Sequence, residues 1–153
     1  MIDEELTVFS GVQSHAMCSR LANGSLFSKP AHRLEPDTFE HEQYLIISDY
    51  YSRALVTGCS HKGIINILDF YSQKFGYSDR VLTNVIGGFH LFNPAGNKTE
   101  DKAFVKKLAE MLNEYDVTFH TCHCTSEKLF FEMVETMGEK LHYLSTGNNL
   151  MIQ

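Results

Sequence analysis

The sequence predicts an α/β protein with a largely parallel or mixed sheet. From residue 43 onward, short apolar runs rich in β-branched residues alternate with three amphipathic stripes at helical spacing. Strands separated by helices imply crossover connections that return the chain to the same sheet. With 153 residues, the chain is long enough for one hydrophobic core. We therefore expect a single domain over 1–153, with an irregular N-terminal arm over 1–40 and a βαβ-rich body over 41–153.

The arm carries few signals for regular structure. Residues 7–9 (TVF) are a candidate strand, and Gly11 and Gly24 interrupt the segment that follows. The residues before Pro30 and Pro36 are disfavoured in helices because the proline ring crowds them. Two arrangements remain open: the arm can lie apart from the sheet, or its apolar residues can fold back over one sheet face.

The first half of the body predicts a hairpin, a helix and a strand. Residues 43–48 (QYLIIS) and 54–57 (ALVT) flank a short connection, a pattern typical of paired strands. Residues 63–75 carry apolar side chains at helical spacing, and Gly76 is expected to end this helix. Residues 81–86 (VLTNVI) predict the next strand.

The second half of the body predicts two further helices between strands. Their apolar stripes are Phe104, Leu108, Met111, Leu112 and Tyr115, then Leu129, Phe130, Met133, Val134 and Met137. Thr99 is the expected N-cap of the first helix, and Ser126 or Thr125 that of the second, because their hydroxyls can accept from free backbone N–H groups. The expected strands are 117–121, 141–145 and 149–152.

Composition and charge favour a globular protein of the cytoplasm. Hydrophobic residues make up 43% and charged residues 21% of the chain, the usual balance of a folded domain. A net charge of −6 disfavours non-specific binding to nucleic acid. No apolar run approaches the roughly 18–20 residues needed to cross a bilayer, and the first residues are acidic where a signal peptide is basic. We expect neither a nucleic-acid nor a membrane partner.

Three expected strands lead into turns that each contain a histidine. The turns are GCSH (58–61), GGFH (87–90) and CHCT (122–125), and their histidines are His61, His90 and His123. Because the carboxyl ends of strands in α/β sheets line the functional crevice, these side chains can converge. Imidazole is a common ligand of zinc and iron. The alternative is that each is an ordinary loop histidine bonded to nearby protein atoms.

The cysteines allow more than one interpretation. Cys18, Cys59, Cys122 and Cys124 should be free thiols or metal ligands in a reducing cytoplasm. The last three lie beside the histidines, where thiolates can bind zinc or act as nucleophiles. They can also be small buried thiols in crowded turns.

The same turns supply candidate substrate-binding residues. Gly87 and Gly88 allow the backbone to approach a ligand closely or to adopt a positive φ. Helices beginning after His61 and after Thr125 would direct free N–H groups toward the same edge of the sheet, where an anionic group can dock. We therefore take Gly87, Gly88, Ser60 and Thr125 as candidate substrate contacts.

Longer runs of sequence carry a family resemblance. TGCSHKGIINIL, VIGGFHL and HCTS, in this order after DTFEHEQYLII, resemble the C-terminal half of metal-dependent hydrolases of the metallo-β-lactamase superfamily. The most similar subgroup is the dihydropterin-methyl-ribofuranosylaminobenzene-phosphate synthase-like one. The resemblance covers roughly residues 35–152 and implies half of an αββα sandwich, with a mixed sheet and helices on one side. One departure is Ser126, where the family motif has glycine.

The resemblance also implies a metal site and a reaction. His61 and His123 match family ligands, and His90 stands where many members carry a bridging aspartate, so it is a ligand or a substrate contact. The expected cofactor is zinc or another divalent metal, and the expected substrate is a small phosphorylated molecule or ester. The metal would polarise the substrate and generate hydroxide from water.

The first half of the family fold is not present in the sequence. No H-x-H-x-D-H motif, which supplies most ligands in the family, occurs here, and His15, His32 and His41 are isolated. We therefore expect an incomplete site that binds zinc weakly and is inactive alone. A separate N-terminal-half subunit or a second copy, in a homodimer, would cover the exposed sheet face. A non-catalytic remnant serving in binding or oligomerisation is the alternative.

Overall fold

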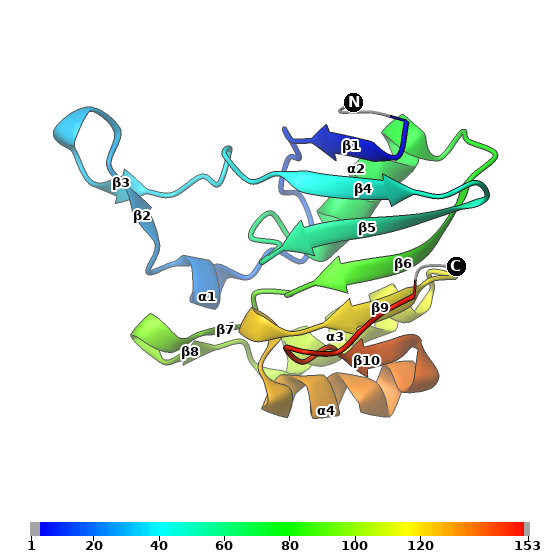
Figure 1. Ribbon diagram of the computed structural model, residues 1–153. Helices are drawn as coiled ribbons and strands as arrows, with labels where there is room; N and C mark the ends of the chain where they lie inside the picture. Colours follow the sequence, from blue (N-terminus) through cyan, green and yellow to red (C-terminus); the bar gives the residue numbers. More distant parts are fainter. Residues whose placement is uncertain (1–3, 152–153) are drawn as a thin grey trace.

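The computed structural model describes residues 4–151 as one six-stranded mixed sheet with its longer helices packed on one face (Figure 1). The strand order is β1-β4-β5-β6-β9-β10. The strands are β1 (Leu6–Phe9), β4 (Tyr44–Ser48), β5 (Ser52–Gly58), β6 (Val81–Gly87), β9 (Thr118–Thr121) and β10 (Leu141–Tyr143). The longer helices are α2 (Ile64–Phe75), α3 (Lys102–Asn113) and α4 (Glu127–Met137). The predicted α/β class is confirmed.

The direction of each strand follows from its connection. β4 and β5 form the expected antiparallel hairpin, and β1 adds to β4 antiparallel at the sheet edge. β5, β6, β9 and β10 run parallel, because α2, α3 and α4 carry the chain back between them. The carboxyl ends of β5, β6 and β9 therefore meet at one end of the sheet, as the sequence predicts.

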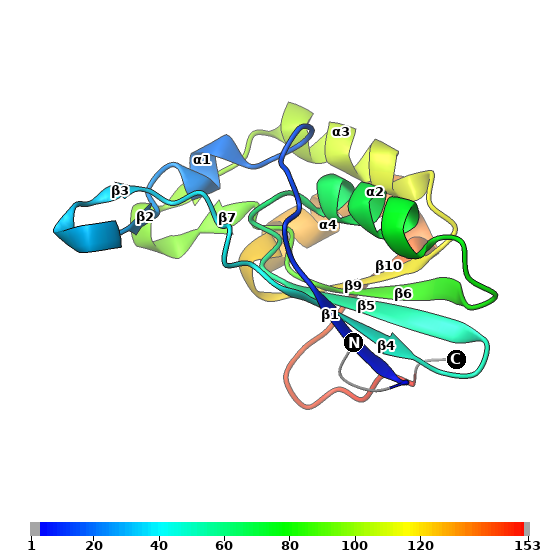
Figure 2. The same cartoon turned by 90° about the horizontal axis from the view of Figure 1, so that it is seen from above.

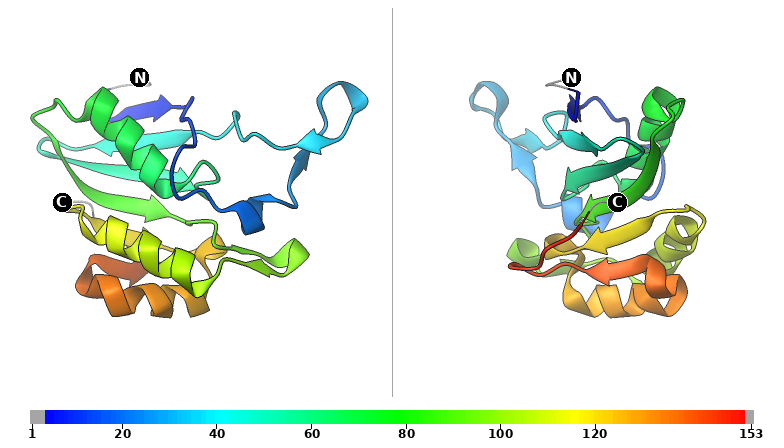
Figure 3. Two further views of the ribbon diagram at one scale, coloured as in Figure 1. Left: turned by 180° about the vertical axis from the view of Figure 1, so that it is seen from behind. Right: turned by 45° about the vertical axis from the view of Figure 1, so that its right-hand side comes forward.

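The core lies between the sheet and the helices. A row of register partners crosses four strands on this face: Ile46, Leu55, Val85 and Phe119. Each is at most 1% exposed. The helices meet this row with their buried stripes, and Figure 3 shows them in front of the sheet when it is seen from behind. Within residues 4–151 no helix is long and apolar enough to cross a membrane.

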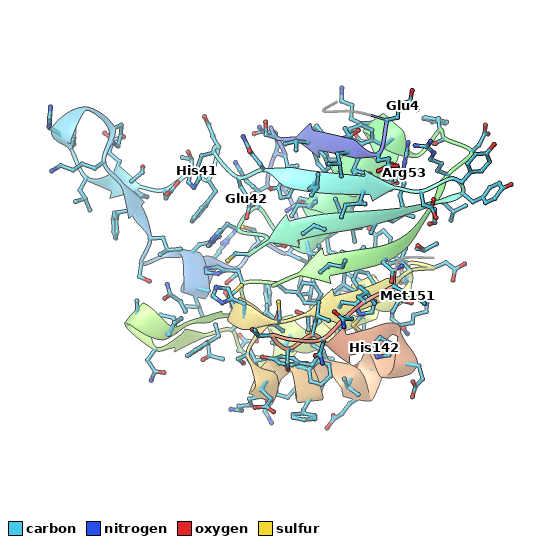
Figure 4. The ribbon with its side chains drawn as sticks, in the orientation of Figure 1. Glu4, His41, Glu42, Arg53, His142 and Met151 are labelled. Atoms are coloured by element: carbon cyan, nitrogen blue, oxygen red, sulfur yellow. The ribbon has the colours of Figure 1, made fainter. Side chains whose placement is uncertain are left out.

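The opposite sheet face is also apolar but has no helix over it (Figure 2). Leu45 pairs with Val56, and Val56 with Ile86, so these aliphatic side chains lie side by side. Together with Ile47 they are only partly buried. We call these four residues the open face. The residues after β10 run back across this side of the sheet, and Met151 lies in front of the strands in Figure 4.

The N-terminal arm is more regular than the sequence indicates. Besides β1 it contains α1 (Arg20–Asn23), β2 (Phe27–Ser28), a 3-10 turn at Pro30–His32 and β3 (Glu35–Pro36). After β1 the arm passes on the helix side, where the backbone of His15 and Ala16 donates to the amide oxygen of Asn66 in α2. The arm therefore does not cover the open face.

Two other sequence expectations differ from the structure. The N-cap of α3 is Asp101, whose carboxylate accepts from Phe104 N–H, whereas Thr99 pairs in a small hairpin of β7 (Phe92–Asn93) and β8 (Lys98–Thr99). Ser126, and not Thr125, caps α4. Residues 149–151 form no strand, and 152 lies outside the described residues. Further 3-10 turns lie at Pro94–Gly96, His123–Thr125 and Gly138–Lys140.

Neighbouring isoleucines on β4 test the difference between the two sheet faces. Ile46→Ala should lower the free energy of unfolding by about 2–5 kcal/mol, because it leaves a cavity in the core. Ile47→Ala removes the same atoms from the open face and should cost about 1 kcal/mol or less. Urea unfolding of both variants measures the difference. Equal losses that do not depend on protein concentration would show that the chain itself covers the open face.

Candidate metal centre

The three predicted histidines converge at the carboxyl ends of β5, β6 and β9. A cavity of about 310 Å³ opens there. Its lining includes all three histidines and two of the four cysteines: Leu26, Cys59, His61, His90, Phe92, Asn93, Pro94, His123 and Cys124. The rings of His61 and His90 are close, with centroids 4.0 Å apart.

Asn23 fixes the proton on the imidazole of His61. The Asn23 amide N–H₂ donates to the His61 carbonyl at 2.9 Å, so the amide oxygen must face the ring. That oxygen lies 3.0 Å from His61 Nδ1, which must therefore carry a proton and donate. The Nε2 atom keeps its lone pair. A histidine that donates from one nitrogen to an oriented acceptor has the usual arrangement of a metal ligand.

The loop that carries His61 is held by groups from the segment before β4. The Glu42 carboxylate accepts the backbone N–H of His61 at 2.7 Å and that of Lys62 at 3.0 Å. The Tyr44 hydroxyl donates to the same carboxylate. Phe39 stacks on the His61 ring, with centroids 4.3 Å apart and planes 2° from parallel. Figure 4 places Glu42 at the same end of the sheet as the carboxyl ends of β5 and β6.

His90 is buried without an evident structural reason. Its side chain is only 5% exposed, yet neither ring nitrogen has a partner in hydrogen-bonding geometry. Burial, and then the charge that His61 can carry, lower the pKa of His90 to about 4, while the nearby Ala22 backbone, outside hydrogen-bonding geometry, partly opposes this. The ring therefore stays neutral at physiological pH. A buried neutral imidazole with free nitrogens normally needs a ligand, because an unsatisfied buried polar group is costly.

His123 completes the group from the third strand end. It lines the same cavity but is exposed, and it begins the 3-10 turn after β9. The backbone is unusual at this end of the sheet. Ser60, His90, His123 and Ser126 have φ angles of 60°, 47°, 51° and 62°. Residues other than glycine keep such angles only where the surroundings enforce them, and they cluster at functional sites.

Two cysteines belong to the cavity and two do not. One ligand atom each from Cys59, His90 and Cys124 lies within 4.8 Å of the others. The Cys124 thiol and then His61 hydrogen-bond to the Cys59 sulfur and lower the pKa of Cys59, although burial opposes this. The pKa of Cys124 is raised because it keeps the proton that it shares with Cys59. Cys18 instead donates to the His61 carbonyl, and Cys122 does not line the cavity.

The four predicted substrate contacts are not among the described residues that line the cavity. A side chain at Gly88 would bring its Cβ to 2.5 Å from the Cys124 sulfur, and one at Gly87 would collide with Thr57. Ser60 is buried and donates to the Thr57 hydroxyl, while Thr125 is buried and accepts from Phe89 N–H. These residues shape the site in the structure, and their contact with substrate stays a prediction.

Residues that the sequence reasoning missed come from the segment before β4 and from the β7 hairpin. Asn23, Phe39 and Glu42 orient His61, and Phe92 to Pro94 form part of the cavity wall. None of them lies in a periodic pattern or a ligand motif. The nearest signal was their polar or aromatic character within a segment interpreted as irregular.

Comparisons with known proteins support the fold. No family model matches the chain. An uncharacterized protein of Methanocaldococcus jannaschii is 32% identical over 74 residues, which is 48% of this chain and 25% of that protein. The crystal structure of a metal-dependent hydrolase of the β-lactamase superfamily matches with a TM-score of 0.73 and 24% identity, over 98% of this chain and 54% of that one. The chain thus has a β-lactamase-like fold and spans about half of this neighbour.

The residues present fit a metal ion. His61 directs a lone pair away from Asn23, and His90 has two ring nitrogens without partners. The two cavity thiols add sulfur donors. Imidazole nitrogen and cysteine sulfur are the ligands that zinc prefers.

The Asn23 contact predicts one imidazole tautomer. In chelator-treated protein, nitrogen-15 NMR of the histidine rings should find His61 protonated on Nδ1. Asn23→Ala should lose this preference and weaken zinc binding by about 10–100-fold, the usual effect of removing a partner of a ligating histidine. Asn23→Asp keeps the acceptor and should retain the tautomer. Protonation of Nε2 in the unchanged protein would contradict the assignment.

Proposed function

We propose that this chain is the C-terminal, metal-binding half of a metal-dependent hydrolase of the metallo-β-lactamase superfamily. One observation carries the proposal: the buried His90 ring has no partner in hydrogen-bonding geometry and lies against the ring of His61, whose Nδ1 is held by Asn23. His123 lines the same cavity. The likeness to the hydrolase structure supports the same reading, because it extends over 98% of this chain. His61, His90 and His123 would hold zinc or another divalent metal.

A bound metal would polarise the scissile group of a substrate and make water acidic enough to supply hydroxide near neutral pH. The chain's own residues orient the ligands. Asn23 holds the tautomer of His61, and Glu42 holds the loop that carries it. The strained backbone at His90 and His123 fixes where their rings project.

No carboxylate that could act as a base is among the described residues that line the cavity. Both oxygens of nearby Glu42 are occupied by backbone N–H groups. The carboxylate and the further ligands would therefore come from a second polypeptide that carries H-x-H-x-D-H.

The substrate we propose is a small ester, with phosphate esters first. A cavity of about 310 Å³ is of the size that holds small molecules. The N-terminus of α4 begins at Glu127, two residues after the His123–Thr125 turn, and helix N-termini favour anionic groups. A non-catalytic metal-binding module is the second candidate, and the missing carboxylate favours it.

The open face supports either of two partners, a separate N-terminal-half subunit or a second copy of the chain. The chain spans 54% of the neighbouring hydrolase, and Leu45, Val56 and Ile86 form a contiguous aliphatic row without a helix over it. A second polypeptide with the missing half would cover this row. In its absence two copies would pair, since one self-complementary patch then serves both.

Hydrolysis tests the catalytic proposal. The purified chain with zinc or manganese should not hydrolyse chromogenic phosphodiesters or carboxyl esters above the metal blank. Addition of a polypeptide carrying H-x-H-x-D-H should produce turnover that falls about 100-fold or more in His61→Ala and in His123→Ala. His32→Ala, in the exposed arm, should have no effect. Turnover by the chain alone that depends on His61 would show that half a site suffices, and no turnover in any mixture would reject hydrolysis.

Light scattering tests the assembly. At micromolar concentration the chain should have twice its monomer mass of 17.4 kDa. A charge on the open face, as in Ile47→Asp, should give monomers because it cannot be buried against a second apolar patch. Phe131→Asp, at an exposed apolar site on α4, should leave the dimer intact. A clean monomer in the unchanged protein would contradict self-association.

A further inference from the structure

Two sulfur atoms accompany the histidines in the cavity, and the proposed three-histidine site gives them no role. Cys59 follows β5, and Cys124 lies in the turn after β9. With His90, from the loop after β6, they place three ligand atoms within 4.8 Å of one another. The three residues come from three different strand ends, so the sheet itself brings them together.

The contacts of Cys124 hold its sulfur in place. The backbone N–H of His90 donates to it at 3.3 Å, and the sulfur lies 3.6 Å from the Cys59 carbonyl. A side chain at Gly88 would meet the same sulfur at 2.5 Å. The sulfur therefore has a fixed position that glycine at 88 permits.

The spacing fits a tetrahedral metal with few adjustments. Zinc bonds of about 2.3 Å to sulfur and 2.0 Å to nitrogen place the ligand atoms of one ion about 3.5 Å apart. The observed separations, all within 4.8 Å, would contract by as much as about 1.3 Å around an ion. The ring centroid of His61 lies 4.0 Å from that of His90, so His61 is close enough to be a fourth ligand.

We propose that Cys59, His90 and Cys124 bind a thiophilic metal ion directly, through two thiolates and one imidazole. Sulfur donors select zinc or copper(I) over magnesium and manganese, which prefer oxygen. All three ligands belong to this chain. The isolated chain therefore binds zinc stoichiometrically, in contrast to the weak binding expected from its histidines alone, and this binding does not require the proposed hydrolysis.

Cobalt(II) is a direct probe, because thiolate ligands give it a strong near-ultraviolet charge-transfer band that imidazole does not. The full chain, reduced and freed of metal, should take up one cobalt with this band and release it to zinc. Cys59→Ser and Cys124→Ser should each lose about half of the band intensity and weaken binding at least about tenfold. Cys18→Ser and Cys122→Ser should change neither.

Alkylation of the unchanged protein tests the same ligands without relying on variants that can fail to fold. Zinc should slow the labelling of Cys59 and Cys124 by iodoacetamide at least about tenfold, with Cys18 and Cys122 as internal controls read by mass spectrometry. Cobalt binding without a thiolate band, protection of Cys122 in place of Cys59, or no metal binding would each overturn the proposal. Loss of hydrolysis with the band intact would instead count against the proposed function alone.

Discussion

The structure depends on one close approach, between the loop after β6 and the turn after β9. Three hydrogen bonds join them: Phe89 N–H to the Thr125 hydroxyl, His90 N–H to the Cys124 sulfur, and Leu91 N–H to the Cys124 carbonyl. They can form only because position 88 has no side chain. Without this contact, the histidines of the two loops would not face one cavity.

Local periodicity made most of the fold predictable from the sequence. The hairpin of β4 and β5 and the helix α2 follow from side-chain spacing, which acts within a few residues. The N-cap of α3 did not follow, since Thr99 and Asp101 both suit that role and tertiary pairing of β8 decides between them. Such a choice depends on contacts that a single stretch of sequence does not contain.

For the site too, local patterns were predictable from the sequence and long-range contacts were not. His61, His90 and His123 were predictable because each follows a strand, and parallel strand ends must meet. Asn23 and Glu42 were not, because they reach His61 across 38 and 19 residues from the segment before β4, where the sequence shows no regular pattern. The pairing of Cys59 with Cys124 was also hidden, since a gap of 65 residues says nothing about two sulfurs sharing one cavity wall.

The arm's hold on His61 also has a consequence for dynamics. The segment from α1 to β3 extends beyond the sheet (Figure 1), and polar contacts such as those of Asn93 with Ala22 and of Glu100 with Leu21 hold it to the body. Segments of this kind open at a lower free energy than the whole domain. Each opening removes Asn23 and leaves the His61 ring free to rotate. The His61 ring therefore stays oriented only while the arm is closed. A molecule that holds the arm closed would strengthen metal binding without contacting the metal.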